Sequence, residues 1–280
     1  MAVHLRITTL VENTATKMGT LAEHGLSMLV EVDDLCLLLD TGQTNTVVHN
    51  AHVLGVDLSR VEHLVLSHGH SDHSGGLMKV LAETGEVIVH GNTDIWRPRY
   101  GTRGGGKPRF SGFPHVREQL ESMGASFHLC DGPDWISREV MTTGPVPRVT
   151  PFEKLDADLK VKTPTGWEQD QVPDDKALLV KTARGLVVLS GCAHSGIVNT
   201  MTWARQVAGE ERIFAVLGGT HLGFSTAEQL AKTVDALHKF GIEKLGVSHC
   251  TGLLAASLLA REFGSRFFFN NVGTVTEWDL

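Results

Sequence analysis

The segment at residues 67–76, Ser-His-Gly-His-Ser-Asp-His-Ser-Gly-Gly, constrains the fold of this 280-residue chain more than any other. It follows an apolar run that predicts a strand at 64–67, and it precedes a run at 77–83 with helical spacing. A strand that ends in a tight turn before a helix brings its last side chains into one small volume. The potential metal ligands in this segment are His68, His70, Asp72 and His73.

Imidazole nitrogens together with a carboxylate suit zinc, and also manganese or iron. The alternative is a polar surface loop whose histidines share no function. Because four potential ligands at this spacing, directly after a strand, are difficult to obtain by chance, we expect one or two bound metal ions. Asp72 is also placed to act in catalysis, by orienting a metal-activated water and taking its proton.

The pattern His-x-His-x-Asp-His after a short apolar strand resembles the signature of the metallo-β-lactamase superfamily. The resemblance implies that the first two histidines serve one metal and that the Asp-His pair serves a second. Upstream, the run Leu-Leu-Leu-Asp-Thr-Gly at 37–42 resembles the family's strand that ends in Asp-x-Gly. The resemblance implies that the aspartate at this position, Asp40 in this chain, orients a ligand histidine. The alternative for Asp40 is a helix N-cap or a turn residue.

Three later predicted strands each end close to a histidine. The strands at 186–190, 213–217 and 244–248 lead into His194, His221 and His249, respectively. Because ligands tend to gather at the carboxyl ends of strands, we expect these histidines to share a site with the motif. A satisfied polar role is the alternative for any single one of them.

The chain departs from the family pattern at two of these ligands. Many members carry a histidine before the hairpin and a bridging aspartate in a Gly-Asp just after it. This chain has no histidine between His128 and His194, and it has Gly191-Cys192 where Gly-Asp would stand. Either Cys192 is a thiolate ligand, or it is a packed thiol and His194 reaches the metal. We favour His194, because a neutral free cysteine is commonly just buried. By chain order His221 matches the family's last ligand and His249 is its rival; whichever does not bind metal would contact substrate or move protons.

Hydrophobic periodicity predicts strands and helices along the whole chain. The predicted strands are 5–10, 27–32, 35–39, 64–67, 87–90, 126–130, 177–181, 186–190, 213–217, 244–248 and 267–272. The predicted helices are 46–54, 77–83, 116–123, 197–207, 227–240 and 253–263. The periodicity alone indicates an α/β protein with mixed sheets. The resemblance implies a single metallo-β-lactamase-like domain over residues 1–280, folded as an αββα sandwich of two mixed sheets.

Between about residues 92 and 150 the pattern loosens, and glycine, proline and arginine accumulate. We interpret this segment as a loop-rich insert, since long irregular segments in compact domains are often functional lids. Its arginines could clamp a phosphate or carboxylate of the substrate, because a guanidinium binds both bidentately. The four candidates are Arg97, Arg99, Arg103 and Arg109. A solvated loop is the alternative.

Bulk composition limits the partners. The formal net charge of −7 argues against a nucleic-acid partner bound by bulk electrostatics. The four cysteines form no Cys-x-x-Cys pair, so no disulfide framework is expected and a reducing cytoplasm is the predicted location. No apolar stretch resembles a signal peptide or reaches membrane-spanning length. The sequence gives no indication of the oligomeric state.

Further segments narrow the resemblance to one branch of the superfamily. They include 144–153, 190–197, 218–222 and 249–252, and they are similar to the branch named 7,8-dihydropterin-6-methyl-4-(β-D-ribofuranosyl)aminobenzene-5′-phosphate synthase. We expect a zinc-type metallo-hydrolase that acts on a small anionic, phosphate-containing substrate through a metal-activated water. The branch name implies an alternative, a transferase that condenses a pterin pyrophosphate with a ribofuranosyl-aminobenzene phosphate. A non-catalytic metal-binding sensor is a third hypothesis.

Overall fold

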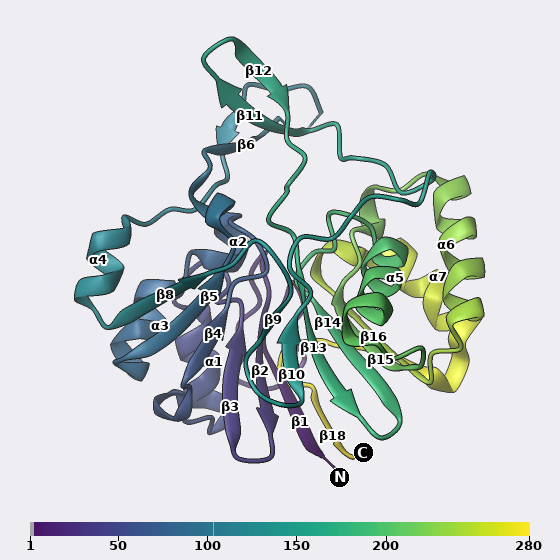
Figure 1. Ribbon diagram of the computed structural model, residues 1–280, viewed down its shortest axis with the longest axis horizontal. Helices are drawn as coiled ribbons and strands as arrows, with labels where there is room; N and C mark the ends of the chain where they lie inside the picture. The colour runs from purple at the N-terminus through teal and green to yellow at the C-terminus, as the bar shows by residue number, and fades with distance from the viewer. Residues whose placement is uncertain (1–2, 103) are drawn as a thin grey trace.

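The computed structural model describes residues 3–102 and 104–280. Two seven-stranded sheets pack against each other, and helices cover both outer faces (Figure 1). This arrangement confirms the αββα sandwich of two mixed sheets that the sequence resemblance implies. The predicted motif lies at one edge of the sandwich, where strands of both sheets end.

The first sheet has the strand order β18-β1-β2-β3-β4-β5-β8. Its strands are β1 (His4–Val11), β2 (Ser27–Val32), β3 (Leu35–Leu39), β4 (His63–Val65), β5 (Val87–Gly91), β8 (Ala125–Leu129) and β18 (Val275–Asp279). The half that contains β18, β1, β2 and β3 is antiparallel, whereas β3, β4, β5 and β8 pair in parallel. Parallel neighbours require crossover connections, and helices provide them here.

The second sheet has the order β17-β16-β15-β14-β13-β10-β9. Its strands are β9 (Asp134–Trp135), β10 (Val140–Thr142), β13 (Ala177–Thr182), β14 (Gly185–Ser190), β15 (Ile213–Gly219), β16 (Lys244–Ser248) and β17 (Phe267–Phe269). Strands β14 to β17 are parallel, so their carboxyl ends all lie at the same edge. The three histidines that follow these strands are therefore brought towards one place.

Helices cover the two outer faces of the sandwich. Those on the first sheet are α1 (Thr46–Leu54), α3 (Leu77–Thr84) and α4 (Arg117–Ser122), whereas the short α2 (Ser71–Ser74) lies at the edge where the strands end. Those on the second sheet are α5 (Ile197–Ala208), α6 (Ala227–Phe240) and α7 (Leu253–Phe263). Short 3₁₀ helices lie at Leu58–Arg60, Thr93–Trp96, Leu222–Phe224, His249–Thr251 and Gly264–Arg266.

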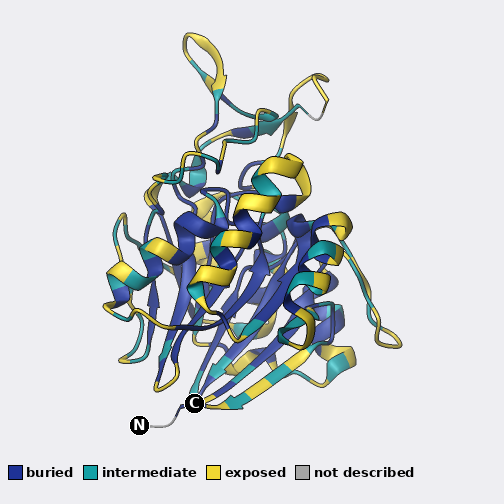
Figure 2. Ribbon diagram, turned by 90° about the vertical axis from the view of Figure 1, so that its right-hand side faces the viewer, coloured by how far each residue is buried: buried dark blue, intermediate teal, exposed yellow. Residues whose placement is uncertain are grey.

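Strand alternation explains the layered core. On β13, Leu178 packs into the cluster between the sheets, whereas Leu179 packs under the helices of the second sheet. On β14, Val187 packs between the sheets and Val188 packs under the helices. A strand that is buried on both faces reads as a continuous apolar run, and this is why the sequence predicted these strands well. Figure 2 shows the strands buried and the outer faces of the helices exposed.

The segment at 92–150 is not one loop-rich insert, which corrects the sequence interpretation. Its strands β8, β9 and β10 belong to the two main sheets. Two other strands, β6 (Arg99–Gly101) and β7 (Arg109–Phe110), form a small four-stranded sheet with β11 (Leu159–Thr163) and β12 (Gly166–Gln169), which stands above the sandwich in Figure 1. These strands are too short and too mixed in burial to produce a clear period of two.

The carboxyl-terminal strand β18 was also missed. It pairs antiparallel with β1, with Asp279 opposite His4. Every second residue of β18 is exposed, because the strand lies at the edge of its sheet. The predicted strand at 267–272 ends earlier, at Phe269. Within the described residues, no helix combines the length and the apolar character needed to cross a membrane.

Candidate metal centre

The His-x-His-x-Asp-His motif spans the turn that joins β4 to α2. Its first two histidines lie in the turn, and its Asp-His pair lies on α2. Two fully buried aspartates hold the backbone of this turn. Asp40 Oδ1 accepts a hydrogen bond from the Ser67 N–H at 2.8 Å, and Asp174 Oδ2 accepts one from the Gly69 N–H at 2.7 Å. These charge-assisted hydrogen bonds fix the directions of the histidines that follow.

Three buried histidines, called here the first trio, converge at the motif: His68, His70 and His194. His194 Nε2 lies 3.2 Å from His68 Nε2 and 3.1 Å from His70 Nδ1. Nitrogen ligands of a tetrahedral zinc ion, at bond lengths of about 2.0–2.1 Å, lie about 3.3 Å from each other. The spacing of the first trio therefore fits one shared cation.

The hydrogen bonds behind His68 determine which of its nitrogens carries the proton. Ser67 Oγ donates its proton to Asp40 Oδ2 at 2.7 Å. The Ser67 oxygen is therefore free to accept a hydrogen bond from His68 Nδ1–H at 2.8 Å. Burial lowers the pKa of His68 well below its usual value, and the ring is neutral. His68 Nε2 therefore directs a lone pair into the first trio, as a metal ligand requires.

A second trio consists of Asp72, His73 and His249. His249 Nε2 lies 3.3 Å from Asp72 Oδ2 and 3.3 Å from His73 Nε2. Asp72 Oδ2 lies 3.9 Å from His73 Nε2. The motif supplies two members of this trio, and the end of β16 supplies the third.

Groups outside the second trio set its tautomers in the same way. Asp40 Oδ2 accepts from His73 Nδ1–H at 2.7 Å, and Asn13 Oδ1 accepts from His249 Nδ1–H at 2.9 Å. With Nδ1 of each ring turned outward in this way, the Nε2 atoms of both rings face the Asp72 carboxylate. Burial opposes protonation of His73, but the carboxylates of Asp40 and Asp72 raise its pKa to about 9. The same negative field favours a cation at this position.

Cys192 lies between the two trios. Its Sγ is 3.1 Å from His73 Nε2, and it groups with His68 and His194 as well as with His73 and His249. The structure thus brings both Cys192 and His194 to the centre, where the sequence favoured His194 alone. Burial raises the pKa of the Cys192 thiol well above its usual value, so a thiolate here requires an adjacent cation.

His249 lies beside the motif's Asp-His pair, whereas His221 groups with Cys192 and Cys250 at ligand spacing. The ring of His221 lies next to that of His194, with centroids 4.4 Å apart, and its Nε2 is 3.4 Å from Asp156 Oδ2. Burial alone would lower the pKa of His221, but Asp156 beside it raises that pKa to about 9. Because β15 and β16 end at the same edge, order along the chain does not decide which histidine lies closer to α2.

Backbone strain is concentrated at this site. Six non-glycine residues among those described have φ between 46° and 58°, in the left-handed region. Four of them lie around the two trios: Asp40, Ala193, His221 and His249. Such conformations cost free energy and persist where the surrounding structure over-determines them, which is common at functional sites.

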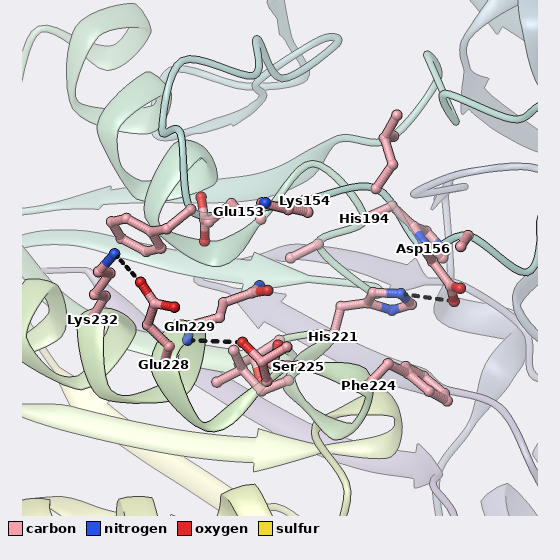
Figure 3. A pocket seen from close by; sticks show the side chains of 18 of the residues that line it. Glu153, Lys154, Asp156, His194, His221, Phe224, Ser225, Glu228, Gln229 and Lys232 are labelled. Atoms are coloured by element: carbon pink, nitrogen blue, oxygen red, sulfur yellow. Dashed lines mark hydrogen bonds and ion pairs between the residues drawn. The ribbon is translucent and has the colours of Figure 1, made fainter.

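A cavity of about 960 Å³ opens beside the first trio. His194 and His221 lie at one end, and the ion pair of Lys232 with Glu228 lies at the other (Figure 3). Lys154 also lines the cavity. The cavity is therefore large enough for a small organic substrate and carries cationic side chains.

Of the four arginines predicted to clamp the substrate, the three that the structure describes lie apart from the cavity. Arg99 is fully buried, with Nη2 2.6 Å from Asp174 Oδ1 and Nε 3.1 Å from Asp170 Oδ2, so it cannot bind a substrate. Arg97 is partly exposed, and Arg109 is exposed on β7; neither lines the cavity. Arg103 lies outside the described residues. The sequence prediction did not include the acidic partners of Arg99, because Asp170 and Asp174 lie in a distant segment of the chain.

Sequence reasoning missed one histidine at the site. His24 Nε2 lies 3.2 Å from Asp72 Oδ2, and His24, Asp72 and His249 form a further group with ligand spacing. His24 lies in an irregular stretch between β1 and β2, with no apolar run before it, so the signal that revealed the other histidines was absent.

Comparisons with known proteins agree with this geometry. Residues 21–198 match the family model described as "Metallo-beta-lactamase superfamily". The chain is 28% identical, over 98% of its length and 97% of the relative, to the Methanocaldococcus jannaschii protein named 7,8-dihydropterin-6-methyl-4-(beta-D-ribofuranosyl)-aminobenzene-5'-phosphate synthase. The crystal structure of Tm1679, described as a metal-dependent hydrolase of the beta-lactamase superfamily, has a TM-score of 0.84 and 29% identity, covering 99% of this chain and 100% of that one. A diphosphatase of the PhnP family shares the fold, with a TM-score of 0.55 and 15% identity, covering 100% of this chain and 99% of that one.

Proposed function

The chain belongs to the metallo-β-lactamase superfamily, and we propose that it is a zinc-dependent hydrolase that acts on a small anionic, phosphate-containing substrate. The observation that carries the proposal is the convergence of histidine nitrogens and a carboxylate in two adjacent trios beside a cavity. The likeness to Tm1679, a metal-dependent hydrolase, supports the reaction class. The net charge of −7 argues for a small molecule rather than a nucleic acid as substrate.

The donor set fits one or two zinc ions. The first trio offers three imidazole nitrogens, and the second offers two nitrogens and a carboxylate, with the Cys192 sulfur between them. Nitrogen and thiolate ligands suit zinc, and the carboxylate also admits manganese or iron. A bound divalent cation would supply Lewis acidity and, at neutral pH, a nucleophilic water.

The chain's own residues move the protons. Burial acts to raise the pKa of Asp72, but His73, His24 and His249 outweigh it and hold that pKa well below its usual range. Asp72 is thus an ionised carboxylate that can accept a proton from water during attack. On the cavity side, His221 is protonated at neutral pH with Asp156 as its partner, so it can stabilise negative charge on the substrate or donate a proton to the leaving group.

A transferase is the second candidate, favoured by the full-length match to the synthase. In that reaction an arylamine nitrogen would displace pyrophosphate from a pterin pyrophosphate, forming a C–N bond and releasing a proton. The ionised Asp72 would be available to accept this proton. Hydrolysis of the same donor would release pyrophosphate without any dependence on the arylamine.

The deciding experiment assays zinc-loaded protein on two sets of reactants. Phosphomonoesters, phosphodiesters and lactones test hydrolysis, and a pterin pyrophosphate with and without an aminobenzene acceptor tests transfer through pyrophosphate release. His70→Ala should abolish turnover, whereas His52→Ala, an exposed histidine on α1, should not. Hydrolysis that disappears in His70→Ala supports the proposal. Pyrophosphate release that requires the acceptor favours the transferase, and full metal loading with no turnover favours a sensor.

A further inference from the structure

Away from the two trios, a group of histidines and one aspartate joins the edges of the two main sheets. His90 on β5 and His128 on β8 are register partners in the first sheet, so both side chains lie on the same face. Asp134 lies on β9, the edge strand of the second sheet. We propose that His90, His128 and Asp134 form an additional zinc site that ties these two edges together.

The ligand atoms have the spacing of a small tetrahedral site. Asp134 Oδ2 lies 3.0 Å from His128 Nε2 and 3.5 Å from His90 Nδ1, and one ligand atom of each residue lies within 4.8 Å of the others. These distances bracket the separation of about 3.3 Å expected between ligands of tetrahedral zinc. No part of this group overlaps with the first or the second trio.

An unsatisfied nitrogen points into the group. His90 is only 6% exposed, and its Nδ1 is buried without a hydrogen-bond partner. Its other nitrogen, Nε2, lies 2.9 Å from His63 Nδ1. When His90 Nε2–H donates to His63, Nδ1 presents a lone pair to the Asp134 carboxylate, and two acceptors face each other. A cation between them removes this conflict.

His63 then has the role that partners of metal-ligating histidines commonly have. A ligand histidine usually donates its second N–H to a neighbouring acceptor, which fixes its tautomer and orientation. Burial also lowers the pKa of His90 to about 4, so its ring is neutral and able to bind metal at neutral pH. Two imidazoles and one carboxylate are ligands typical of zinc rather than of calcium or magnesium.

The position of the site suggests what it does. The side chains of His128 and Asp134 are 53% and 21% exposed, so the ion would enter from solvent and keep an open position. Leu66, which lies two residues before His68, donates its N–H to the His90 carbonyl at 2.9 Å. A cation here would bind only the folded state and would stabilise the strand that leads into the motif.

The test is zinc stoichiometry and affinity measured by equilibrium dialysis on the full chain. His128→Ala and Asp134→Asn should each lose one zinc ion per chain relative to wild type while keeping the metal bound by the two trios. His128 is largely exposed, so its variant should fold, and His52→Ala is the matched control with unchanged zinc. His70→Ala should retain this additional zinc, which separates the site from the main centre.

A crystal of zinc-loaded protein should show an anomalous peak between the three side chains, separate from any at the trios. Equal stoichiometry in wild type, His128→Ala and Asp134→Asn would overturn the proposal. Filling only at millimolar zinc would overturn it too. The same holds for imidazole ¹⁵N shifts that place the proton of His90 on Nδ1 in the presence of zinc, because that tautomer cannot ligate through this atom.

Discussion

Arg99 and Asp174 form a bidentate ion pair with both side chains fully buried, Nη1 to Oδ2 at 2.7 Å and Nη2 to Oδ1 at 2.6 Å. Asp174 Oδ2 also accepts the Gly69 N–H, between His68 and His70. The pair therefore supports the turn of the first trio from behind. The two residues are 75 positions apart in the sequence, so local sequence patterns do not indicate that Arg99 has a partner.

The role of this pair gives the first prediction. Arg99→Ala leaves the buried Asp174 without its partner, and breaking a buried ion pair in this way costs about 3–5 kcal/mol of unfolding free energy. Urea unfolding followed by circular dichroism measures the loss. Arg109→Ala, at an exposed position, is the control and should change stability by less than about 0.5 kcal/mol. If Arg99→Ala keeps wild-type stability and raises KM, Arg99 binds the substrate instead of supporting the turn.

Removal of either motif histidine should deplete the main centre. His68→Ala and His70→Ala each remove one nitrogen from a trio that has three, so both should lose metal after dialysis. Metal content by mass spectrometry on the purified variants provides the measurement. His52→Ala again serves as the control for loss of a histidine at the surface. Unchanged stoichiometry in both motif variants would refute the ligand assignment.

Cys192 and His194 can be separated by substitution. His194→Ala should lose metal and activity, because His194 Nε2 contacts both other members of the first trio. Cys192→Ser should keep metal and most activity if its thiol is packed rather than ligating. Cobalt substitution offers a direct readout, since a thiolate ligand gives an intense charge-transfer absorption in the near ultraviolet. Loss of metal in Cys192→Ser with retention in His194→Ala would identify a thiolate site.

Much of the fold was readable from the sequence because its strands are buried on one or both faces. The elements Ser27–Val32, Ala227–Phe240 and Leu253–Phe263 have the predicted bounds, since each carries a continuous or strongly periodic apolar pattern. The small sheet that includes β6 and β11 was not predicted. Its two short hairpins are joined by β6 and β11, which pair across more than fifty residues, so local patterning carries little information about the sheet.

The candidate site was predictable in its residue types but not in its pairings. The motif and the strand ends indicated the histidines, because glycine-flanked histidines after apolar runs are visible in the sequence. Which of His249 and His221 lies beside the Asp-His pair depends on which strand end lies opposite α2, and sequence order does not encode that distance. His24 and the partners of Arg99 lie in loops without periodicity, so only the tertiary structure reveals them.

The lining of the cavity indicates which positively charged side chain should bind an anionic substrate. Lys154 lines it, whereas Arg97 and Arg109 do not. Lys154→Ala should raise KM for a phosphorylated substrate by about fivefold, equivalent to about 1 kcal/mol for a solvent-exposed charge pair. Steady-state kinetics on that substrate and on its neutral analogue give the comparison, and only the charged one should be affected. If Arg97→Ala or Arg109→Ala raises this KM more than Lys154→Ala does, the arginines and not Lys154 bind the anionic group.

Glu153 should make stability depend on pH. It lies against the N-terminus of α5, although it is distant in sequence; it is 6% exposed and accepts the N–H groups of Val198 and Asn199, each at 2.8 Å. Burial outweighs these hydrogen bonds and raises its pKa from 4.5 to about 7. Between these two values the folded protein holds a proton that the unfolded chain has released. The free energy of unfolding therefore falls as pH rises through this window, by about 3 kcal/mol in total.

Glu153→Gln removes this titration, so the comparison of wild type with the variant isolates it. In metal-free protein, the unfolding free energy of wild type minus that of Glu153→Gln should fall by about 3 kcal/mol from pH 4 to pH 8. Glu228→Gln is the control with the opposite sign, because the hydrogen bond from Lys232 lowers the pKa of Glu228. Urea unfolding at several pH values provides the measurement. A difference that stays constant or increases with pH would show that the two backbone hydrogen bonds outweigh burial, and that Glu153 is an ionised cap of α5.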